Sequence, residues 1–582
     1  MENNDKLAGI RHSLAHLLAA AVLKKFPDAK LAIGPVIENG FYYDFLLSRG
    51  LTPEDLKDFE KDMKKMIGGK LPFTGKEVDK TEAKEIFKNQ QFKLELIEEF
   101  AEEGKTLTTY KTGEIFLDLC RGGHVDNTSE INPDAFMLDK TAGAYWRGDE
   151  KKPMLQRIYG VAFETKEELD KYLAMIAEAK KRDHKKLGPE LDLFTFSDLV
   201  GPGLPLWTPK GTLVRNLLDD FVWSLRAKRG YMKVEIPHIT KKSLYETSGH
   251  WDKYKDELFR ITTREGHEFA MKPMNCPHHT QIYARRPWSY RELPQRYANT
   301  TTCYRDEQTG ELSGLSRVRA FAQDDAHVFC RMSQAKEEFL KIWDIIHEFY
   351  PVFGFELKVR LSLHDPAQPE KYLGNKDNWK IAEDMLREIV AEKKIEWIEG
   401  VGEAAFYGPK LDFMVKDAIG REWQVATIQL DMNMPERFDL TCANEKGEKE
   451  RIVMIHAAIM GSIERFLSIA IEHFAGAFPL WLAPVQAIIL PVSEKFEDYA
   501  NKVGAQLKSA GIRVEVSDPN ETLGKRIRES EMQKIPYVLV VGEKEEPENT
   551  ASVRHYRRGQ EGAEKIDVLL EKLAREIKEK AL

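Results

Sequence analysis

The chain has 582 residues, of which 42% are hydrophobic and 31% charged, and its formal net charge is −8; this length predicts about three to four domains, and the charge excludes an overall basic field but not a local basic face. The five cysteines form no CxxC pair, which argues against a disulfide framework. Neither a signal peptide nor an apolar stretch of the ~20 residues that span a bilayer is recognisable, so we expect a cytoplasmic protein without membrane contact.

The first 165 residues mix strand and helix patterns. "AKLAIGPVIENGFYYDF" (29–45) predicts two strands, with a Gly-Pro turn between them and an Asn-Gly turn before the second is complete. "TPEDLKDFEKDMKKMI" (52–67) predicts a helix with Thr52 as its N-cap.

Two pairs of metal-type side chains occur in the same region. His12 and His16 in "HSLAH" are four residues apart and share a helix face, and "CRGGH" repeats the spacing. Together they could close around Zn²⁺, although a partly buried helix histidine is the commoner outcome for either histidine alone. The remaining candidates of this pocket are Lys93, Asp118, Cys120 and His124.

The rest of the chain divides by pattern into three segments. Residues 166–189 predict one long charged helix, ending near Gly188-Pro189, that we interpret as a linker. Residues 190–480 predict an amphipathic helix followed by a strand over 211–239, a buried strand over 420–432 and an apolar helix that ends at Gly476. Residues 483–582 alternate strand and helix, which predicts an α/β domain with a largely parallel sheet.

Cys276 in "KPMNCPHH" has three interpretations that the residues themselves leave open. A nucleophile would need a base, a zinc ligand would need further N or S donors, and a small buried thiol needs neither.

The stretch from residue 303 to 330 contains several arginines. "CYRDEQTGELSGLSRVRAFAQDDAHVFC" (303–330) predicts a hairpin with Arg305 and Arg319 on neighbouring strands, suited to phosphates or, alternatively, to a surface salt-bridge ladder. "GSIERF" (461–466) places Glu464 and Arg465 in an apolar helix, where unpaired charges are costly, so a ligand role is favoured there.

These motifs resemble those of a known family. "RGYMKVEIPHI", "YRDE…RVRAF" and "GSIERF" resemble motifs 1, 2 and 3 of class II aminoacyl-tRNA synthetases, and "SGHWDKYKDELF", "MKPMNCPHH", "QDDAHVFC", "AAFYGPKLDF" and "TAGAYWRGD" are similar to strings of the bacterial threonyl-tRNA synthetases. The resemblance runs from residue 8 to near 580. It implies a class II antiparallel-sheet catalytic core (190–480), an N-terminal α+β editing domain (1–165), a linker helix (166–189) and a C-terminal α/β anticodon-binding domain (483–582). Because the chain begins almost at "HSLAH", we expect it to lack the ubiquitin-like domain that many bacterial members carry.

The resemblance implies a catalytic zinc held by Cys276, His327 and His456, which are 51 and 129 residues apart. Three protein ligands leave coordination open for the α-amine and β-hydroxyl of threonine, so valine, which lacks the hydroxyl, is rejected. By the same matching, the threonine pocket comprises Arg305, Gln323, Asp325, Tyr407 and Gln429, and the ATP site comprises Arg305, Glu307, Arg317, Phe321, Gln424, Ser462 and Arg465, with Mg²⁺ on the phosphates.

Further roles follow from the resemblance. His250 matches a base proposed for transfer to the terminal ribose of tRNA(Thr), and Glu545 and Arg554 match residues that read anticodon bases. Serine is smaller than threonine by one methyl, worth only ~1–3 kcal/mol of discrimination, so a hydrolytic editing site is expected. His12, His16, Lys93, Asp118, Cys120 and His124 match that site, as catalytic or tRNA-binding residues with metal as the minority interpretation.

The family also implies a homodimer, because motif 1 usually forms the subunit interface. Competing hypotheses are a synthetase for proline, serine or histidine, a synthetase-like RNA-binding regulator without aminoacylation, and a seryl-tRNA hydrolase attached to an inactive body. The regulator hypothesis is disfavoured because Arg305 and Arg465, which such proteins usually lose, are both present.

Overall fold

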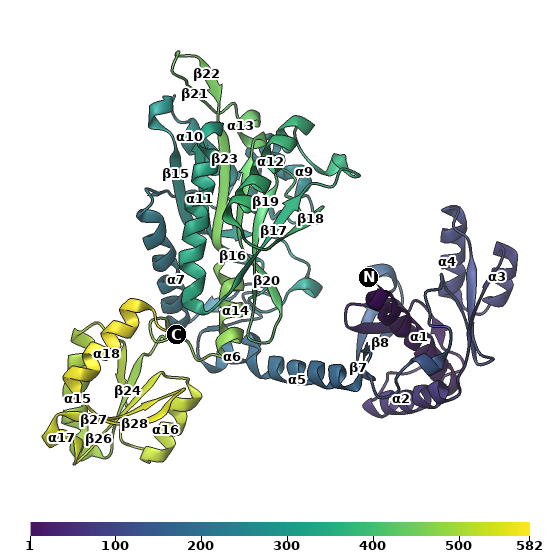
Figure 1. The fold of residues 1–582 in the computed structure, drawn as a ribbon, viewed down its shortest axis with the longest axis horizontal. Coiled ribbons are helices and arrows are strands. Elements are labelled where there is room, and N and C mark those ends of the chain that lie inside the picture. The colour runs from purple at the N-terminus through teal and green to yellow at the C-terminus, as the bar shows by residue number, and fades with distance from the viewer. Residues whose placement is uncertain (1) are drawn as a thin grey trace. The chain divides into compact units, whose positions relative to one another are not determined.

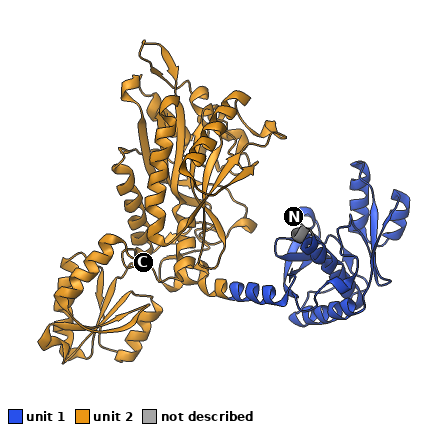
Figure 2. Ribbon diagram, viewed as in Figure 1, with its two compact units in different colours: residues 1–177 blue, residues 178–582 orange. Residues whose placement is uncertain are grey.

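The computed structural model describes residues 2–582, with side chains from Lys6 onward. The chain forms two compact units, residues 1–177 and 178–582, and the boundary falls inside helix α5 (Lys166–Arg182) (Figure 2). In the part of the chain that is described, no helix is long and apolar enough to cross a membrane.

The first unit is built on helix α1 (Glu2–Lys25), whose apolar side chains pack on a five-stranded sheet (Figure 1). The sheet has the order β1 (Lys30–Leu31), β3 (Gly40–Leu46), β8 (Met154–Ala162), β7 (Phe136–Tyr145). Strand β2 (Val36–Ile37) pairs with β3 across a turn at Glu38-Asn39, one residue before the predicted Asn-Gly turn, because Gly40 already belongs to β3. The predicted helix is α2 (Pro53–Gly68), and Thr52 caps it in a reciprocal capping box with Asp55. A second sheet contains β4 (Phe73–Glu77), β5 (Thr108–Thr112) and β6 (Phe116–Leu119), and α3 (Lys80–Ile86) and α4 (Gln91–Glu102) lie between β4 and β5 in the chain.

The segment predicted as one linker helix contains two. Helix α5 ends at Arg182, and α6 (His184–Glu190) begins after Asp183, whose side chain accepts a hydrogen bond from the Lys185 amide. An aspartate that caps a new helix ends the preceding one, because its backbone leaves the helical conformation. The charged face of the sequence did not reveal this break.

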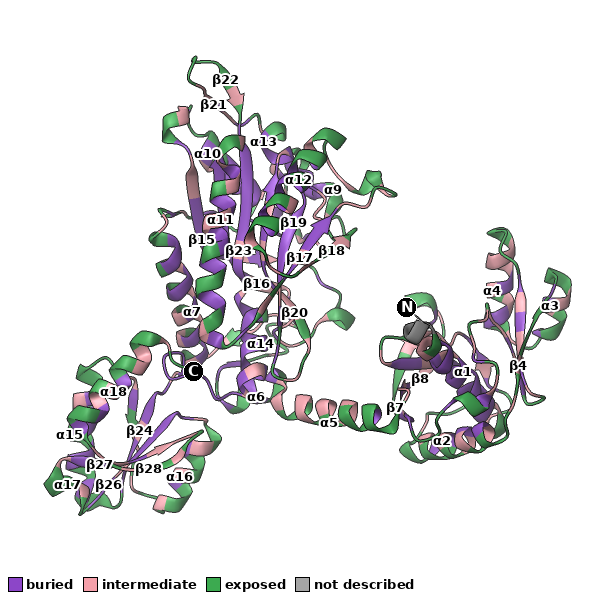
Figure 3. Cartoon of the chain, viewed as in Figure 1, coloured by how far each residue is buried: buried purple, intermediate pink, exposed green. Residues whose placement is uncertain are grey.

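The centre of the second unit is an eight-stranded sheet, mostly buried (Figure 3). Its order is β11 (Met232–Lys233), β15 (Gln295–Tyr304), β16 (Ala320–Cys330), β23 (Val453–Ser462), β20 (Glu422–Asp431), β19 (Lys410–Lys416), β17 (Leu357–Leu363) and β18 (Trp397–Val401). Neighbours from β15 to β17 are antiparallel, and only the two edge pairs are parallel. Helices α7 (Pro209–Ala227), α11 (Met332–Phe349) and α14 (Ile463–Phe474) contribute apolar side chains to the same core.

A bulge in β23 redirects the two central strands. Between Gln323 and Asp325 of β16 the paired residue on β23 jumps from Ser462 to Ala458, so β23 holds the extra residues. The carboxylate of Asp324 accepts the amide hydrogens of Ile459 at 2.9 Å and Met460 at 3.0 Å, which stabilises the bulge. The bulge places Ser462 at the start of α14.

The C-terminal part of the second unit has the predicted alternation of strands and helices. Strands β24 (Ala487–Pro491), β25 (Val514–Val516) and β26 (Tyr537–Val541) are parallel, and α15 (Glu497–Ser509), α16 (Leu523–Met532) and α18 (Ile566–Glu579) are the predicted helices. Two strands that the sequence did not predict, β27 (Thr550–His555) and β28 (Gly559–Lys565), add antiparallel to β26. The sheet is therefore mixed rather than largely parallel.

Candidate active site and metal cluster

A cavity of about 880 Å³ opens on the sheet of the second unit. Side chains alternate across a strand, so Phe321, Gln323, Asp325 and His327 of β16 all face this cavity. Every predicted ATP and threonine residue lines it, namely Arg305, Glu307, Arg317, Phe321, Gln323, Asp325, Tyr407, Gln424, Gln429, Ser462 and Arg465.

The predicted arginine hairpin is present at one end. The amide of Arg305 donates to the carbonyl oxygen of Arg319 at 2.9 Å, which closes the end of the β15–β16 pair. The guanidinium of Arg305 lies 5.3 Å from the ring of Phe321, and its Nε has no hydrogen-bond partner among the residues that the structure describes. The nearest carboxylate is that of Glu257, whose Oε2 is 4.0 Å from this Nε. A buried guanidinium N–H that makes no hydrogen bond and faces a cavity is suited to an anionic ligand.

The other charged residues at this end differ in how they are paired. Arg317 donates through Nε to Glu307 at 2.7 Å and through Nη2 to Glu311 at 3.1 Å, so Arg317 and Glu307 bind each other here. Burial lowers the pKa of Arg465, which makes no ion pair with any described side chain. Glu464 is buried and satisfied within the protein by Arg215 and the Ala322 amide, so the ligand role favoured for the "GSIERF" charges is left to Arg465.

The polar groups at the other end are held in hydrogen-bonded pairs. The hydroxyl of Tyr407 donates to Oε1 of Gln429 at 2.6 Å, and Asn275 donates to Oδ2 of Asp325 at 3.0 Å. Asp325 Oδ1 is 3.7 Å from Nε2 of His327. In the part of the wall predicted to bind ATP, Gln424 donates to Asp412 at 2.7 Å, which fixes its amide.

Cys276, His327 and His456 converge beside these groups. One possible ligand atom from each lies within 4.8 Å of the others, and all three residues are buried. Cys276 opens helix α10 (Cys276–Ala284), whereas the histidines are directly paired on β16 and β23. Burial raises the pKa of the Cys276 thiol well above its usual value and lowers that of His327 well below. A thiol and two imidazoles, at these distances, fit the donor set of a zinc ion.

Outer partners orient both imidazoles. His456 Nε2 lies 2.9 Å from Asp431 Oδ2, which leaves Nδ1 directed at the cluster. His327 Nδ1 lies 2.7 Å from Nδ1 of His279, which leaves Nε2 for the cluster. A metal-binding histidine usually has such a partner on its other nitrogen, so this observation also fits a metal. His278 is not part of the cluster.

His250 lies beside the cluster rather than on the cavity wall. It is fully buried, its Nδ1 is 2.8 Å from Ser248 Oγ, and its Nε2 is 3.7 Å from the Cys276 sulfur. Burial lowers its pKa to about 3, so in this arrangement it is a weak base. Its role in transfer stays a prediction.

The first unit contains the second predicted cluster. His12 Nε2 is 3.4 Å and His124 Nε2 is 3.2 Å from the sulfur of Cys120, and His16 completes a group within 4.8 Å. The glycines at 122 and 123 have φ of +89° and +81°, so the loop after β6 turns through backbone conformations that favour glycine.

A cavity of about 240 Å³ lies beside this cluster, and a buried ion pair lines it. Lys93 Nζ is 2.6 Å from Asp118 Oδ1, and the hydroxyl of Tyr43, which the sequence did not single out, donates to Asp118 Oδ2 at 2.6 Å. His12, His16, Lys93, Asp118 and Cys120 line this cavity. The patterns "HSLAH" and "CRGGH", with Lys93 and Asp118, thus predicted one local site.

The anticodon candidates lie on different elements of the C-terminal sheet domain. Glu545 begins α17 (Glu545–Glu548), and Arg554 on β27 pairs with Glu531 at 2.6 Å.

Three family models match the chain. Residues 259–474 match the tRNA synthetase class II core domain (G, H, P, S and T), residues 486–580 match the anticodon binding domain, and residues 107–159 match the threonyl and alanyl tRNA synthetase second additional domain. The fold and the cavity therefore define a class II aminoacyl-tRNA synthetase.

Relatives narrow the family further. The chain is 50% identical over 573 residues to the threonine–tRNA ligase of Porphyromonas gingivalis, covering 97% of this chain and 87% of that one. It is 48% identical over 588 residues to that of Thermus thermophilus, covering 98% and 89%. A crystal structure titled as the RNA binding domain of threonyl-tRNA synthetase from Cryptosporidium parvum matches with a TM-score of 0.64 at 38% identity, covering 68% of this chain and 98% of that one. The chain belongs to the threonine–tRNA ligase family.

Proposed function

We propose that this chain activates L-threonine with ATP and transfers it to the 3′ end of tRNA(Thr), with zinc at Cys276, His327 and His456. The observation that supports this most strongly is convergence: three ligand-type residues from distant segments come within 4.8 Å beside the cavity that Arg305, Phe321 and Arg465 also line.

The protein groups of the amino-acid end have distinct roles. When bound, zinc would supply a Lewis-acidic contact for the α-amine and β-hydroxyl of threonine. Asp325, held by Asn275, accepts the hydrogen of the threonine hydroxyl. Tyr407 and Gln429 close the pocket, and Gln323 lies between it and the ATP end. Valine would leave the carboxylate of Asp325 without the donor that the threonine hydroxyl supplies, which costs more than a missing methyl.

The ATP end works by positioning and charge. Arg305 binds the α-phosphate and the threonine carboxylate, which brings the two reacting groups together. Phe321 and Arg465 enclose the adenine, and Glu307 binds its edge. Arg317 binds the distal phosphates with Mg²⁺, which requires it to exchange its Glu307 contact for the ligand. Gln424 and Ser462 complete the wall.

We propose that the first unit hydrolyses seryl-tRNA(Thr). The buried Lys93–Asp118 pair beside His12, His16, Cys120 and His124 supports a polar site that can orient a water molecule. The cavity is separate from the synthetic one, since the two are lined by different units of the chain.

The remaining assignments rest on the family. They are anticodon reading by Glu545 and Arg554, a homodimer, a cytoplasmic location, and domains at 1–165, 190–480 and 483–582 joined by a linker at 166–189.

Pyrophosphate exchange with threonine, valine and serine tests the main proposal, together with zinc content per chain. We expect threonine-dependent exchange, weaker exchange with serine, negligible exchange with valine and one zinc per chain. A synthetase-like RNA-binding regulator would instead bind tRNA without any exchange, and that result would overturn the proposal.

A further inference from the structure

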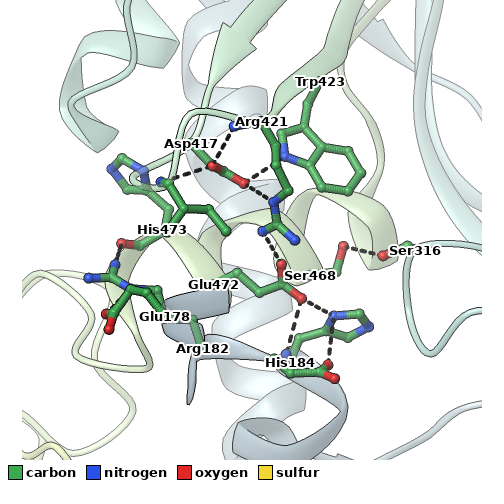
Figure 4. A network of polar contacts seen from close by, with 12 residues as sticks. Glu178, Arg182, His184, Ser316, Asp417, Arg421, Trp423, Ser468, Glu472 and His473 are labelled. Carbon is green, nitrogen blue, oxygen red and sulfur yellow. Dashed lines mark hydrogen bonds and ion pairs between the residues drawn. The ribbon is translucent and has the colours of Figure 1, made fainter. Parts of the chain in front are cut away.

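His184, the first residue of α6, is a buried hub outside the cavity (Figure 4). Its backbone amide donates to Glu472 Oε1 at 3.2 Å, and its ring Nδ1 lies 2.6 Å from the same oxygen. Its ring Nε2 accepts the amide hydrogen of Leu315 at 3.0 Å. Since Nε2 accepts, Nδ1 carries the proton and donates to the carboxylate of Glu472, while Asp183 Oδ1 lies farther from it, at 3.8 Å.

Leu315 is at the tip of a closed turn. Ser313 and Arg317 exchange backbone hydrogen bonds at 3.1 and 3.4 Å, and the side chain of Leu315 between them is fully buried. Arg317 is the last residue of this turn, and it lines the cavity at the end predicted to bind ATP. A contact that fixes the tip of the turn therefore also fixes the backbone position from which the Arg317 side chain extends.

The turn fits closely against the imidazole. Gly314 has φ of +52°, and a Cβ at that position would lie 2.3 Å from Nε2 of His184. A residue with a side chain would be strained and would push the turn off the ring. Ser316 adds a second contact, a hydrogen bond of 3.0 Å to Ser468 on α14, and Ser468 in turn donates to the carbonyl oxygen of Arg465 at 2.7 Å.

Glu472 extends the network to another residue of the cavity wall, Trp423. Its other oxygen pairs with Arg421, whose Nε donates to Asp417 at 2.7 Å (Figure 4). The same Asp417 oxygen accepts the indole N–H of Trp423 at 2.9 Å, and Trp423 lines the cavity. Helix α5 is attached nearby, because Arg182 donates to the carbonyl oxygen of His473 at 3.0 Å.

We propose that His184 is a positioning residue for ATP: by accepting the Leu315 amide it holds the Ser313–Arg317 turn against α14, so that Arg317 is placed for the phosphates. The segment that leads out of α5 thereby becomes part of the ATP site without touching ATP. This inference rests on the proposed role of Arg317 in ATP binding.

Two substitutions at one position separate the two ring contacts. In His184→Asn the amide nitrogen can replace Nδ1 and keep the Glu472 contact, but nothing reaches the Leu315 amide. In His184→Gln the amide oxygen can replace Nε2 and keep the Leu315 contact. We expect His184→Asn to raise the KM for ATP in threonine-dependent pyrophosphate exchange about tenfold, as loss of one buried hydrogen bond implies. His184→Gln should stay within about threefold of the wild type, and the KM for threonine should change little in either.

Hydrogen–deuterium exchange of the peptide over residues 306–319 gives a reading that does not depend on catalysis. In His184→Asn we expect the amides of this peptide to take up deuterium about tenfold faster than in the wild type. We expect the same in Gly314→Ala, which disturbs the turn from the other side. Lys186→Ala, an exposed position on the same helix, is the matched control. If the chain showed no threonine-dependent pyrophosphate exchange, the proposed function would fail. The deuterium-uptake comparison would still test whether His184 holds the turn.

Equal KM values for ATP in His184→Asn and His184→Gln would overturn the inference. A parallel rise of the KM for ATP and the KM for threonine in His184→Asn would also overturn it. So would an unchanged rate of deuterium uptake by the 306–319 peptide in that variant.

Discussion

Asp431→Asn should weaken zinc binding without removing a ligand. Oδ2 of Asp431 faces His456 Nε2 at 2.9 Å, while Oδ1 accepts the amides of Asn433 at 2.8 Å and Met434 at 2.9 Å. A carboxylate only accepts, so the His456 proton is held on Nε2 and Nδ1 is free for metal. An asparagine that keeps both backbone contacts turns its NH₂ group towards Nε2, where two donors would meet.

Either way of relieving that conflict costs zinc affinity. The proton can move to Nδ1 of His456, which blocks the atom that lies 3.1 Å from His327 Nε2 in the cluster. Alternatively the amide rotates and leaves the two backbone amides without their acceptor. One lost buried hydrogen bond costs about 1–3 kcal/mol, which agrees with the roughly 10–100-fold loss of metal affinity typical of such outer partners.

Competition with a coloured chelator, on the full-length chain, measures this affinity directly. Asp439→Asn, which makes the same change in an exposed carboxylate paired with Arg451, is the control and should bind zinc like the wild type. The reasoning fails if Asp431→Asn holds zinc as tightly as the control, or if it melts at a lower temperature while its zinc affinity is unchanged.

Four further outcomes are expected. Cys276→Ala should lose zinc and threonine-dependent pyrophosphate exchange together, measured by metal analysis and exchange rate. His12→Ala should charge tRNA with threonine normally but accumulate seryl-tRNA, measured by charging with each amino acid. Lys93→Met should strand a buried carboxylate and destabilise the first unit by about 3–5 kcal/mol, seen as faster deuterium exchange in that unit. Glu472 has its pKa lowered to about 2, because hydrogen bonds from the imidazole and guanidinium described above outweigh the opposing effect of burial. Its ionised form therefore stabilises the fold above about pH 4.5, and Glu472→Gln should lose about 3 kcal/mol at pH 7, a gap in melting stability that closes as the pH falls towards 2.

Each of these has a matched control or a contrary result. Cys330 is also fully buried but lies outside the cluster, so Cys330→Ala should keep zinc, and normal exchange in Cys276→Ala would contradict the zinc assignment. Seryl-tRNA that stays low in His12→Ala would remove the editing assignment. Lys80→Met, at an exposed ion pair, should leave the first unit unchanged. A constant gap between wild type and Glu472→Gln from pH 7 to pH 3 would show that ionisation of Glu472 is not what stabilises the fold.

Features that depend on residues close together in the chain could be predicted from the sequence, because residue spacing and local hydrogen bonding determine them. The four-residue spacing of His12 and His16 puts both on one face of α1, and the Thr52 cap follows from local hydrogen bonding. The arginine hairpin was also readable, since two strand patterns flank one turn-rich loop.

The sets that depend on sheet order were not readable. His327 and His456 are cross-strand partners on β16 and β23, strands that more than a hundred residues separate. No spacing rule joins them, and only the family resemblance connected them with Cys276. The His184 hub has its partners at Leu315 and Glu472, which lie on a turn and a helix that no local pattern relates to the linker.

Two elements were missed for physical reasons. The break at Asp183 was hidden because charged residues run through both α5 and α6, so the pattern continues across the cap. Strand β28 was missed because none of its residues is buried and most are polar, and an edge strand of that kind lacks the apolar alternation that predicts a strand.

The alternation of side chains along β16 fixes a length. Phe321 and His327 lie on the same face, six residues apart, which in an extended strand corresponds to about 20 Å. A single molecule that reached both the Phe321 ring at one end and the cluster of Cys276, His327 and His456 at the other would have to be about that long, and a shorter molecule could contact only one of them. A one-residue insertion between them would turn Asp324 or its neighbours into the cavity, so this spacing can change only in steps of two residues.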